Sequence, residues 1–224
     1  MEYCISKIVE LNIENSIFDS IADCTYVVLC CGENPKRLPS VMKYIYILNP
    51  TKKVKLIYNK GYKDCSLSKS VNNDLVNIQA YIFRDALKNN YKRILFLEDD
   101  FELKNKIDKK DIDNINNFIQ KNNPCVYGLG NVAIPTINTL FSSHQKIAFN
   151  SFGLTHGLFY NKKGMTKILD YYTQNYNNIT IGIDTSIANV SDIETYRYYK
   201  PLIYQKLPET QNQKEGWDNQ IGSF

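Results

Sequence analysis

Short, continuous apolar runs alternate along the chain with longer segments whose apolar residues recur every three or four positions. The first pattern predicts strands buried on both faces, and the second predicts amphipathic helices. The apolar runs are residues 25–31, 54–58 and 94–97, followed by strand candidates at 125–129 and 146–150. The predicted helices are residues 38–48, 72–89, 108–122 and 162–176. A last apolar run, residues 179–183, precedes Asp184.

Strands that alternate with helices in this order predict an α/β fold, a Rossmann-like sandwich with a mainly parallel central sheet. We expect residues 1–24 to form an N-terminal extension, residues 25–207 to form one domain, and residues 208–224 to be a polar C-terminal tail. Ligands of open α/β sheets bind outside the carboxyl ends of the strands. Polar residues follow three of the predicted strands, which places a candidate binding site at that end of the sheet.

The charge balance argues against nucleic acid as a partner. The 224 residues include 27 basic and 23 acidic side chains, for a net charge of +4, and only four of the basic residues are arginine. Proteins that bind nucleic acid usually carry a basic face that includes arginine. We therefore expect no nucleic-acid partner.

The apolar segments are too short for a membrane span, which needs roughly 20 residues. The first residues include several glutamates and no long apolar segment, so we expect neither a secretory signal nor a transmembrane segment, and a cytoplasmic location. Six cysteines without a Cys-x-x-Cys spacing predict free, buried thiols in a reducing compartment.

Three consecutive carboxylates, Glu98, Asp99 and Asp100, directly follow the apolar run at 94–97. Repulsion among them would raise their pKa values unless a cation is present. Carboxylate oxygens suit Mg²⁺ or Mn²⁺, and proteins often share these ions with substrate phosphates. At a strand end the side chains diverge, so that one can bind the metal while another reaches a ribose hydroxyl. A solvated acidic turn is the alternative interpretation.

The chain contains only two histidines, His144 and His156. An imidazole can complete a carboxylate metal site or contact an acceptor sugar, and His156 is the candidate for such a role. A hydrogen-bonded loop histidine is the alternative. His144 lies in a polar run, where we expect no functional role.

Several motifs occur in a fixed order within residues 25–212: TYVVLCCGENPKRL, YKRILFLEDDFEL, THGLFYNKKGMTKIL, and IGIDTSIA followed by YKPLIYQKLPETQN. Together they resemble the GT-A glycosyltransferases, most closely the lipooligosaccharide and collagen galactosyltransferases and their giant-virus relatives. The resemblance aligns the first motif with a nucleotide-binding strand and the second with a DxD-type metal motif. It implies a GT-A fold and, if the chain is viral, a location in the host cytoplasm or the virion.

The resemblance also implies an activity. A metal-dependent glycosyltransferase would move a sugar from a nucleotide-sugar donor, with a UDP-sugar favoured, to a glycan or glycoprotein acceptor, with inversion. Asp100 would bind Mn²⁺ or Mg²⁺ directly, with His156 as a further candidate ligand. Glu98 or Asp99 would hold the ribose or groups around the metal.

The remaining nucleotide-binding candidates follow the first two strands. Gly32 would allow close approach of the nucleotide, and Arg37 would pair with its phosphate groups. Asn59 and Lys60 would lie near the base, where a flat slot favours uracil over a larger purine.

An inverting transferase needs a carboxylate that takes a proton from the acceptor hydroxyl. The resemblance places this base in the C-terminal half, and we expect Asp184 in that role, with Asp192 and Glu194 as rivals. A helix N-cap is the alternative interpretation of Asp184.

Two other functions remain open from the sequence. A nucleotidyltransferase would share the carboxylates and Mg²⁺, although such enzymes usually have a glycine-rich phosphate loop. A non-catalytic GT-A-like module would bind a glycan or nucleotide without transferring it. The oligomeric state is not determined by the sequence.

Overall fold

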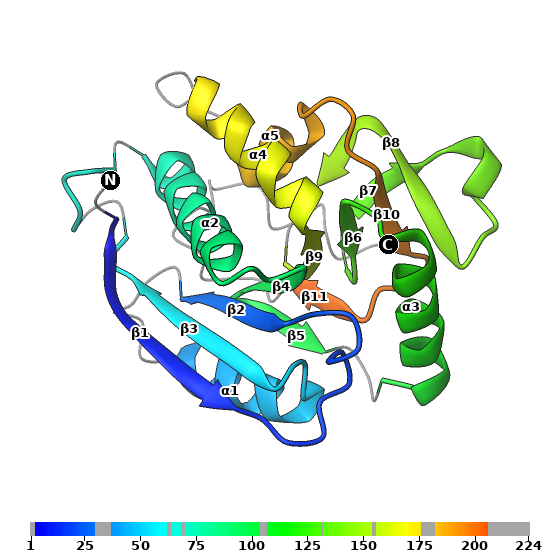
Figure 1. Cartoon of the computed structure of the whole chain (residues 1–224), viewed down its shortest axis with the longest axis horizontal. Coiled ribbons are helices and arrows are strands. Elements are labelled where there is room, and N and C mark those ends of the chain that lie inside the picture. The colour runs from blue at the N-terminus through cyan, green and yellow to red at the C-terminus, as the bar shows by residue number, and fades with distance from the viewer. Residues whose placement is uncertain are drawn as a thin grey trace.

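The computed structural model describes residues 3–29, 37–61, 64–68, 70–103, 107–130, 132–153, 156–175 and 182–205 (Figure 1). The helices are α1 (Arg37–Leu48), α2 (Val71–Lys88), α3 (Lys109–Asn122), α4 (Lys162–Asn175) and α5 (Ile183–Ala188), with a 3₁₀ turn at Ile137–Thr139. The strands are β1 (Ile5–Asn12), β2 (Cys24–Leu29), β3 (Lys53–Asn59), β4 (Arg93–Glu98), β5 (Phe101–Leu103), β6 (Val126–Gly128), β7 (Val132–Pro135), β8 (His144–Gly153), β9 (Leu158–Asn161), β10 (Thr195–Tyr198) and β11 (Ile203–Gln205). Gly32 and the expected tail at 208–224 lie outside the described residues.

Nine strands of the described part form one sheet in the order β1-β3-β2-β4-β9-β6-β10-β8-β7. β2 lies between β3 and β4 and runs parallel to both. β9 is antiparallel to β4 and β6, and β10 is parallel to β6 but antiparallel to β8. Strands β5 and β11 form a separate antiparallel pair. The expected α/β class is therefore confirmed.

The expectation of a mainly parallel sheet is wrong. Parallel pairing is confined to β3–β2, β2–β4 and β6–β10, and the other neighbours in the large sheet pair antiparallel. One cause is β9, a four-residue strand that runs back between β4 and β6. All four of its residues are buried, so its sequence shows no alternation that would indicate its neighbours or its direction.

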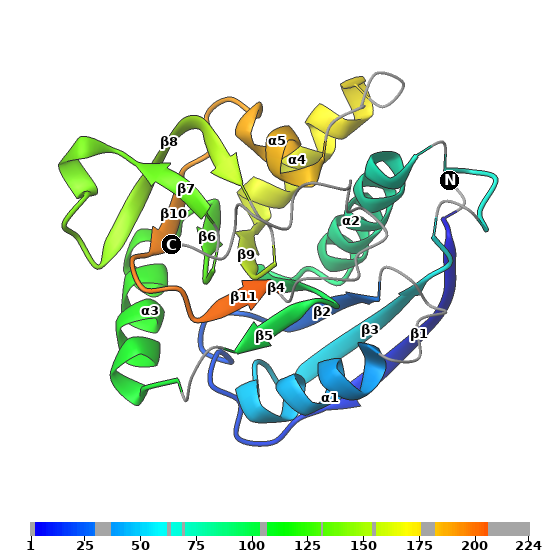
Figure 2. The same cartoon turned by 180° about the vertical axis from the view of Figure 1, so that it is seen from behind.

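Helices cover both faces of the sheet, as the two opposite views show (Figures 1 and 2). One hydrophobic core joins the sheet to α2, α4 and α5, and a second joins it to α1 and α3. Along β2, Tyr26 and Val28 belong to the first core, whereas Val27 and Leu29 belong to the second. This alternation follows from the two-residue period of a strand and explains why the run is apolar throughout.

The four long helices begin and end within one or two residues of the predicted positions. Local capping explains two of the starts. The side chain of Ser70 accepts a hydrogen bond from the backbone N–H of Asn73 at 3.2 Å, and Asp108 accepts one from Lys110 at 3.0 Å.

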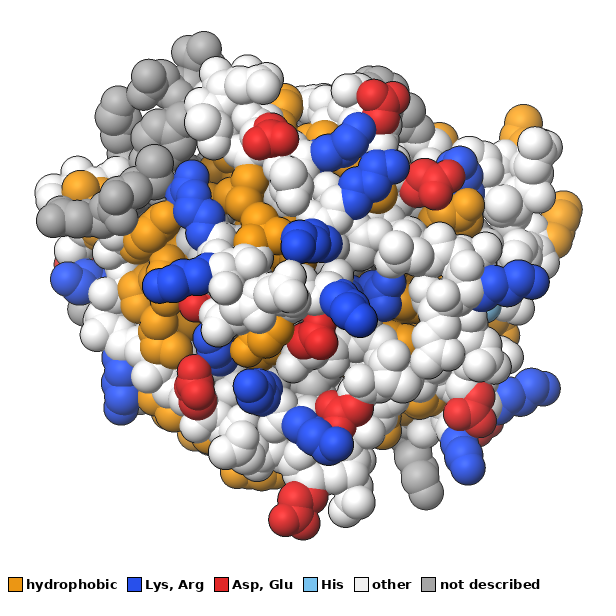
Figure 3. Space-filling model, in the orientation of Figure 1, with side chains coloured by type: hydrophobic (Ala, Val, Ile, Leu, Met, Phe, Trp, Pro, Cys, Tyr) orange, Lys and Arg blue, Asp and Glu red, His pale blue; other side chains and the backbone are white. Residues whose placement is uncertain are grey.

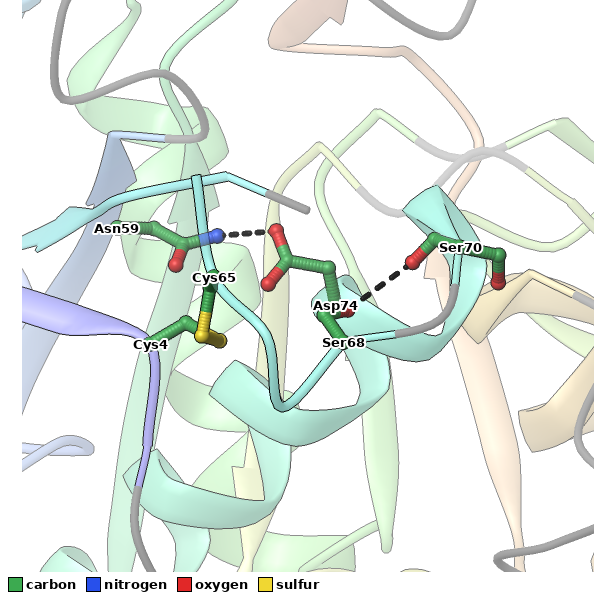
Figure 4. The surroundings of a disulfide bond; sticks show 6 residues. All are labelled: Cys4, Asn59, Cys65, Ser68, Ser70 and Asp74. Carbon is green, nitrogen blue, oxygen red and sulfur yellow. Dashed lines mark hydrogen bonds between the residues drawn. A yellow bond between two sulfur atoms is a disulfide. The ribbon is translucent and has the colours of Figure 1, made fainter. Parts of the chain in front are cut away.

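The N-terminal segment is part of the sheet. β1 pairs antiparallel with β3 over seven residue pairs, so the region expected as an extension supplies an edge strand. A disulfide between Cys4 and Cys65 fastens the start of β1 to the loop after β3 (Figure 4). The expectation of six free thiols is therefore wrong. Cys24 and Cys125 are the free, buried cysteines of the described part.

Strand direction defines two edges of the sheet. β2, β3 and β4 are parallel, so Leu29, Asn59 and Glu98 lie at one edge, which we call the carboxyl edge. Arg93, at the start of β4, lies at the opposite, amino edge. Among the described residues, no helix has the length and apolarity needed to cross a bilayer.

Candidate functional site

The alternation of β4 separates the acidic residues that follow it. Ile94 and Phe96 pack in the core with α2, whereas Leu95 and Leu97 pack in the core with α1. The same alternation directs Glu98 toward the α2 face.

Asp99 faces the α1 side, where it forms an ion pair with Arg37, the first residue of that helix. Arg37 Nη1 lies 2.5 Å from Asp99 Oδ1, and only 14% and 2% of the two side chains are exposed. Two residues predicted separately as nucleotide ligands are thus in contact. A buried pair with so little exposure is held in one geometry, since separating the charges would leave each without compensation.

Asp100 lies close to His156, and both side chains are buried. Burial lowers the pKa of His156, while the charge of Asp100 and hydrogen bonds with the backbone of Gly130 and Ile203 raise it. A Cβ added to Gly130 would lie 1.7 Å from the Ile203 carbonyl oxygen and 3.2 Å from His156 Nε2. Glycine is therefore required at position 130 for β11 and the imidazole to approach.

The described carboxylates and histidine at this edge do not by themselves form a complete metal-binding site. Within the part of the chain that the structure describes, no group of three or more His, Cys, Asp or Glu side chains could hold a metal ion. Mg²⁺ is often held by one or two carboxylates, with phosphates and water completing its shell. Asp100 fits that arrangement better than His156. Hydrogen bonds that raise a histidine pKa are donated by the ring, so the imidazole already faces backbone acceptors.

Asn59, at the carboxyl end of β3, is fully buried and donates from Nδ2 to Asp74 Oδ2 at 2.5 Å (Figure 4). Burial raises the pKa of Asp74, and hydrogen bonds from Asn59 and Ser68 oppose that shift. The other two oxygens, Asn59 Oδ1 and Asp74 Oδ1, are buried and have no hydrogen-bond partner among the described residues. The pair therefore encloses two acceptor atoms that no described hydrogen bond uses.

Lys60 lies on the disulfide side of β3. Its backbone N–H donates to the Cys4 carbonyl at 2.7 Å. Its side chain helps to line a surface cavity of about 580 Å³, together with Tyr3, Cys65 and Tyr81. The backbone of Cys4, which the disulfide joins to Cys65, therefore holds the chain directly after Asn59.

Asp184 is in the first turn of α5, so it does not end a strand as expected. Ile183, the last residue of the apolar run, begins this helix, and residues 176–181 lie outside the described part. Asp184 Oδ1 is 2.8 Å from the place where a Cβ on Gly182 would be.

Glu98 and Asp184 approach the same buried residue. Both negative charges contribute, after burial, to raising the pKa of Tyr160 well above its usual value. The Tyr160 hydroxyl accepts a hydrogen bond from Gln79, whose side-chain oxygen accepts one from Tyr172. A buried chain of hydrogen bonds therefore extends from α4 through α2 toward the two carboxylates.

The two rivals of Asp184 lie at the wrong edge. Glu194 directly precedes β10, whose direction matches that of β4 through β9 and β6, so it lies at the amino edge. It is exposed and pairs with Lys146 at 3.4 Å. Asp192 is 83% exposed and lies 3.8 Å from Lys167. Neither carboxylate is placed with Asp99 and Asp100.

Several residues of the site were not predicted from the sequence. They include Gly130, Ile203 and Asp74, although a glycine directly after a strand often marks close approach of another chain segment. His144 packs against aromatic side chains. Its ring stacks on Phe118, its Nδ1 is 2.7 Å from the Tyr127 hydroxyl, and burial lowers its pKa to about 4.

Searches for related proteins add nothing to this geometry. The chain matches no protein-family model, and no curated protein matches it either.

Proposed function

We propose that the protein is a GT-A-type glycosyltransferase that uses a divalent cation and a nucleotide-sugar donor, with a UDP-sugar favoured. The acceptor would be a glycan or glycoprotein, and the transfer would invert the anomeric configuration. The observation that carries the proposal is the placement of the buried Arg37–Asp99 ion pair and the adjacent Asp100, which lies close to His156, at the carboxyl edge. This is the edge at which open α/β sheets bind ligands.

The leaving diphosphate requires positive charge. Arg37 is held beside this edge by its buried ion pair with Asp99. Guanidinium groups bind phosphate through directed, charge-assisted hydrogen bonds, so Arg37 would contact the diphosphate from there. A divalent cation, when bound, stabilises the charge that develops on the diphosphate. Asp100 would hold it, with His156 positioning Asp100.

The base of the nucleotide would lie near Asn59. The side-chain oxygens of Asn59 and Asp74 are buried, so the base would lie against the end of β3, where a flat slot would favour uracil over a larger purine. Purines present a larger and different edge.

The acceptor would be activated by Asp184. Asp184→Asn should leave UDP binding intact and lower sugar transfer by roughly 10²–10⁴, the usual contribution of a general base. Transfer at the wild-type rate would exclude Asp184 as the base. Asp192 and Glu194 would not take its place, because both lie at the amino edge.

The decisive experiment is calorimetry with UDP and Mn²⁺. Asp100→Asn should abolish the Mn²⁺-dependent part of the affinity, a loss of roughly 100-fold or more for a direct ligand. Asp113→Asn, on the exposed side of α3, is the matched control and should bind like the wild type. Equal affinity in both variants would contradict the metal role, and tighter binding of GDP than UDP would reject the uridine donor.

A non-catalytic module that binds a nucleotide or glycan is the second candidate. The observation in its favour is that His156 is already engaged by the backbone of Gly130 and Ile203, which makes it a poor metal ligand. It predicts UDP binding that is indifferent to Mn²⁺ and no hydrolysis of any nucleotide-sugar.

The cytoplasmic location also stays a prediction, and the Cys4–Cys65 disulfide is unusual for a reducing compartment.

A further inference from the structure

A second cavity, of about 730 Å³, lies at the amino edge of the sheet. It is formed where β4 begins, where β9 passes into α4 and where α3 ends. Its described lining consists of Lys92, Arg93, Asn123, Asn161, Lys162, Lys163, Thr166 and Lys167. Arg93 and Glu98 are the two ends of β4, so the cavity and the candidate active site lie at opposite edges.

The cavity is strongly basic. Five of its described lining residues are lysine or arginine, and none is acidic. Lys and Arg side chains also gather near the centre of the face shown in Figure 3, where α4 begins in the same orientation. Like charges brought together in a concave site repel one another and raise the local concentration of anions.

Nearby carboxylates compensate only part of this charge. Asp192 lies 3.8 Å from Lys167 Nζ. Asp23 accepts hydrogen bonds from the backbone N–H groups of Lys92 and Arg93, and it raises the pKa of Arg93 against the lowering caused by burial. Within the described residues, Lys92, Lys162 and Lys163 form no ion pair.

The polar residues inside the ring of lysines are held in place. Arg93 donates to the carbonyl of Ile21 and to the side chain of Asn123. Asn161 donates to the Asn123 carbonyl at 2.8 Å and accepts from the backbone N–H of Gly164 at 2.8 Å. The arginine and the amides are therefore preorganised, which lowers the entropic cost of binding a ligand.

We propose that this cavity binds a small polyanion that carries two or more phosphate groups. Its volume is within the range of roughly 300–1,000 Å³ that is typical of small-molecule sites. Lysine ammonium groups recognise phosphate as point charges, and the fixed guanidinium of Arg93 adds positive charge to the wall of the cavity. A concave site with an ordered arginine suits a discrete ligand better than the flat surface of a membrane.

The test is calorimetric titration with sodium tripolyphosphate in the presence of a chelator, at low ionic strength. The chelator removes the divalent metal that the carboxyl edge would need, and substitutions at the amino edge alone then identify the site that is measured. The wild type should bind, and added salt should weaken the binding. Lys92→Gln with Lys163→Gln should weaken it by roughly tenfold or more, as expected when charge-assisted hydrogen bonds are lost.

The matched control is Lys109→Gln with Lys110→Gln, which removes the same charge from the exposed start of α3. The control variant should bind tripolyphosphate like the wild type. Equal weakening in both variants, or no binding by the wild type, would overturn the proposal. So would cosedimentation of the wild type with phosphatidylserine vesicles in the absence of tripolyphosphate binding, which would indicate a membrane surface as the ligand.

Discussion

The two ends of β4 differ in the sign of their charges and in how far those charges are buried: carboxylates are buried at one end, and lysines are exposed at the other. At the carboxyl edge, Asp99 and Asp100 are buried and lie against Arg37 and His156. At the amino edge, lysines surround an open cavity, and only Lys167 of them forms an ion pair within the described part. The charged groups of the carboxyl edge contact other groups of the protein. Those of the amino edge face the solvent, where a ligand can reach them.

The difference follows from burial. A charge removed from water must find a partner, because an isolated buried ion costs several kcal/mol. An exposed lysine has no such requirement, since its ammonium group stays hydrated on a flexible stem. The buried edge therefore holds its side chains in fixed positions, as the proposed sugar transfer requires. The exposed edge attracts anions.

The largest expected effect comes from breaking the buried pair. Asp99→Asn leaves Arg37 facing a neutral amide and should lower the free energy of unfolding by roughly 3 kcal/mol. Glu194→Gln breaks the exposed Lys146 pair near the amino edge and should change it by less than about 1 kcal/mol. Urea denaturation measures both. Equal losses would show that burial does not distinguish the edges, and adding Arg37→Met to Asp99→Asn should recover part of the stability.

The disulfide should contribute a comparable amount. Cys4 and Cys65 are 61 residues apart, and closing a loop of that length restricts the unfolded chain by up to about 4 kcal/mol, of which disulfides typically realise about 2–4 kcal/mol. Cys4→Ser with Cys65→Ser should lower the urea midpoint by a matching amount. A reductant should reproduce the loss in the wild type and have no effect on the double variant. A wild type that is insensitive to reductant would contradict this contribution.

The smallest effect is expected at the amino edge. Lys92→Gln with Lys163→Gln removes two repelling charges and should leave the free energy of unfolding within about 0.5 kcal/mol of the wild type, or slightly above it. Any gain should disappear at high salt. A loss of more than 1 kcal/mol would mean that these lysines have internal partners, and the contrast between the edges would fail.

Much of the local structure could be predicted from the sequence. The apolar runs at 54–58 and 94–97 are β3 and β4 with one more residue at each end, and the long helices were found with small shifts. Periodicity and capping are local properties, so a single chain reveals them. The polar residues at the ends of these strands were also found in this way.

The partners of those residues could not be predicted. Asn59 meets Asp74, and Asp100 meets His156, across separations that no spacing rule covers. The same limit explains the unexpected disulfide and the placement of Asp192 and Glu194 at the amino edge. Each depends on strand direction and neighbour order, which a fully buried strand such as β9 does not encode locally.

The sequence by itself thus determined an α/β chain whose polar residues gather after buried strands. The tertiary structure alone decided which charges are paired, which carboxylates share an edge and where a basic cavity opens. The physical reason is that secondary structure responds to neighbours within a few residues, whereas charge pairing, thiol pairing and concavity require segments brought together by folding.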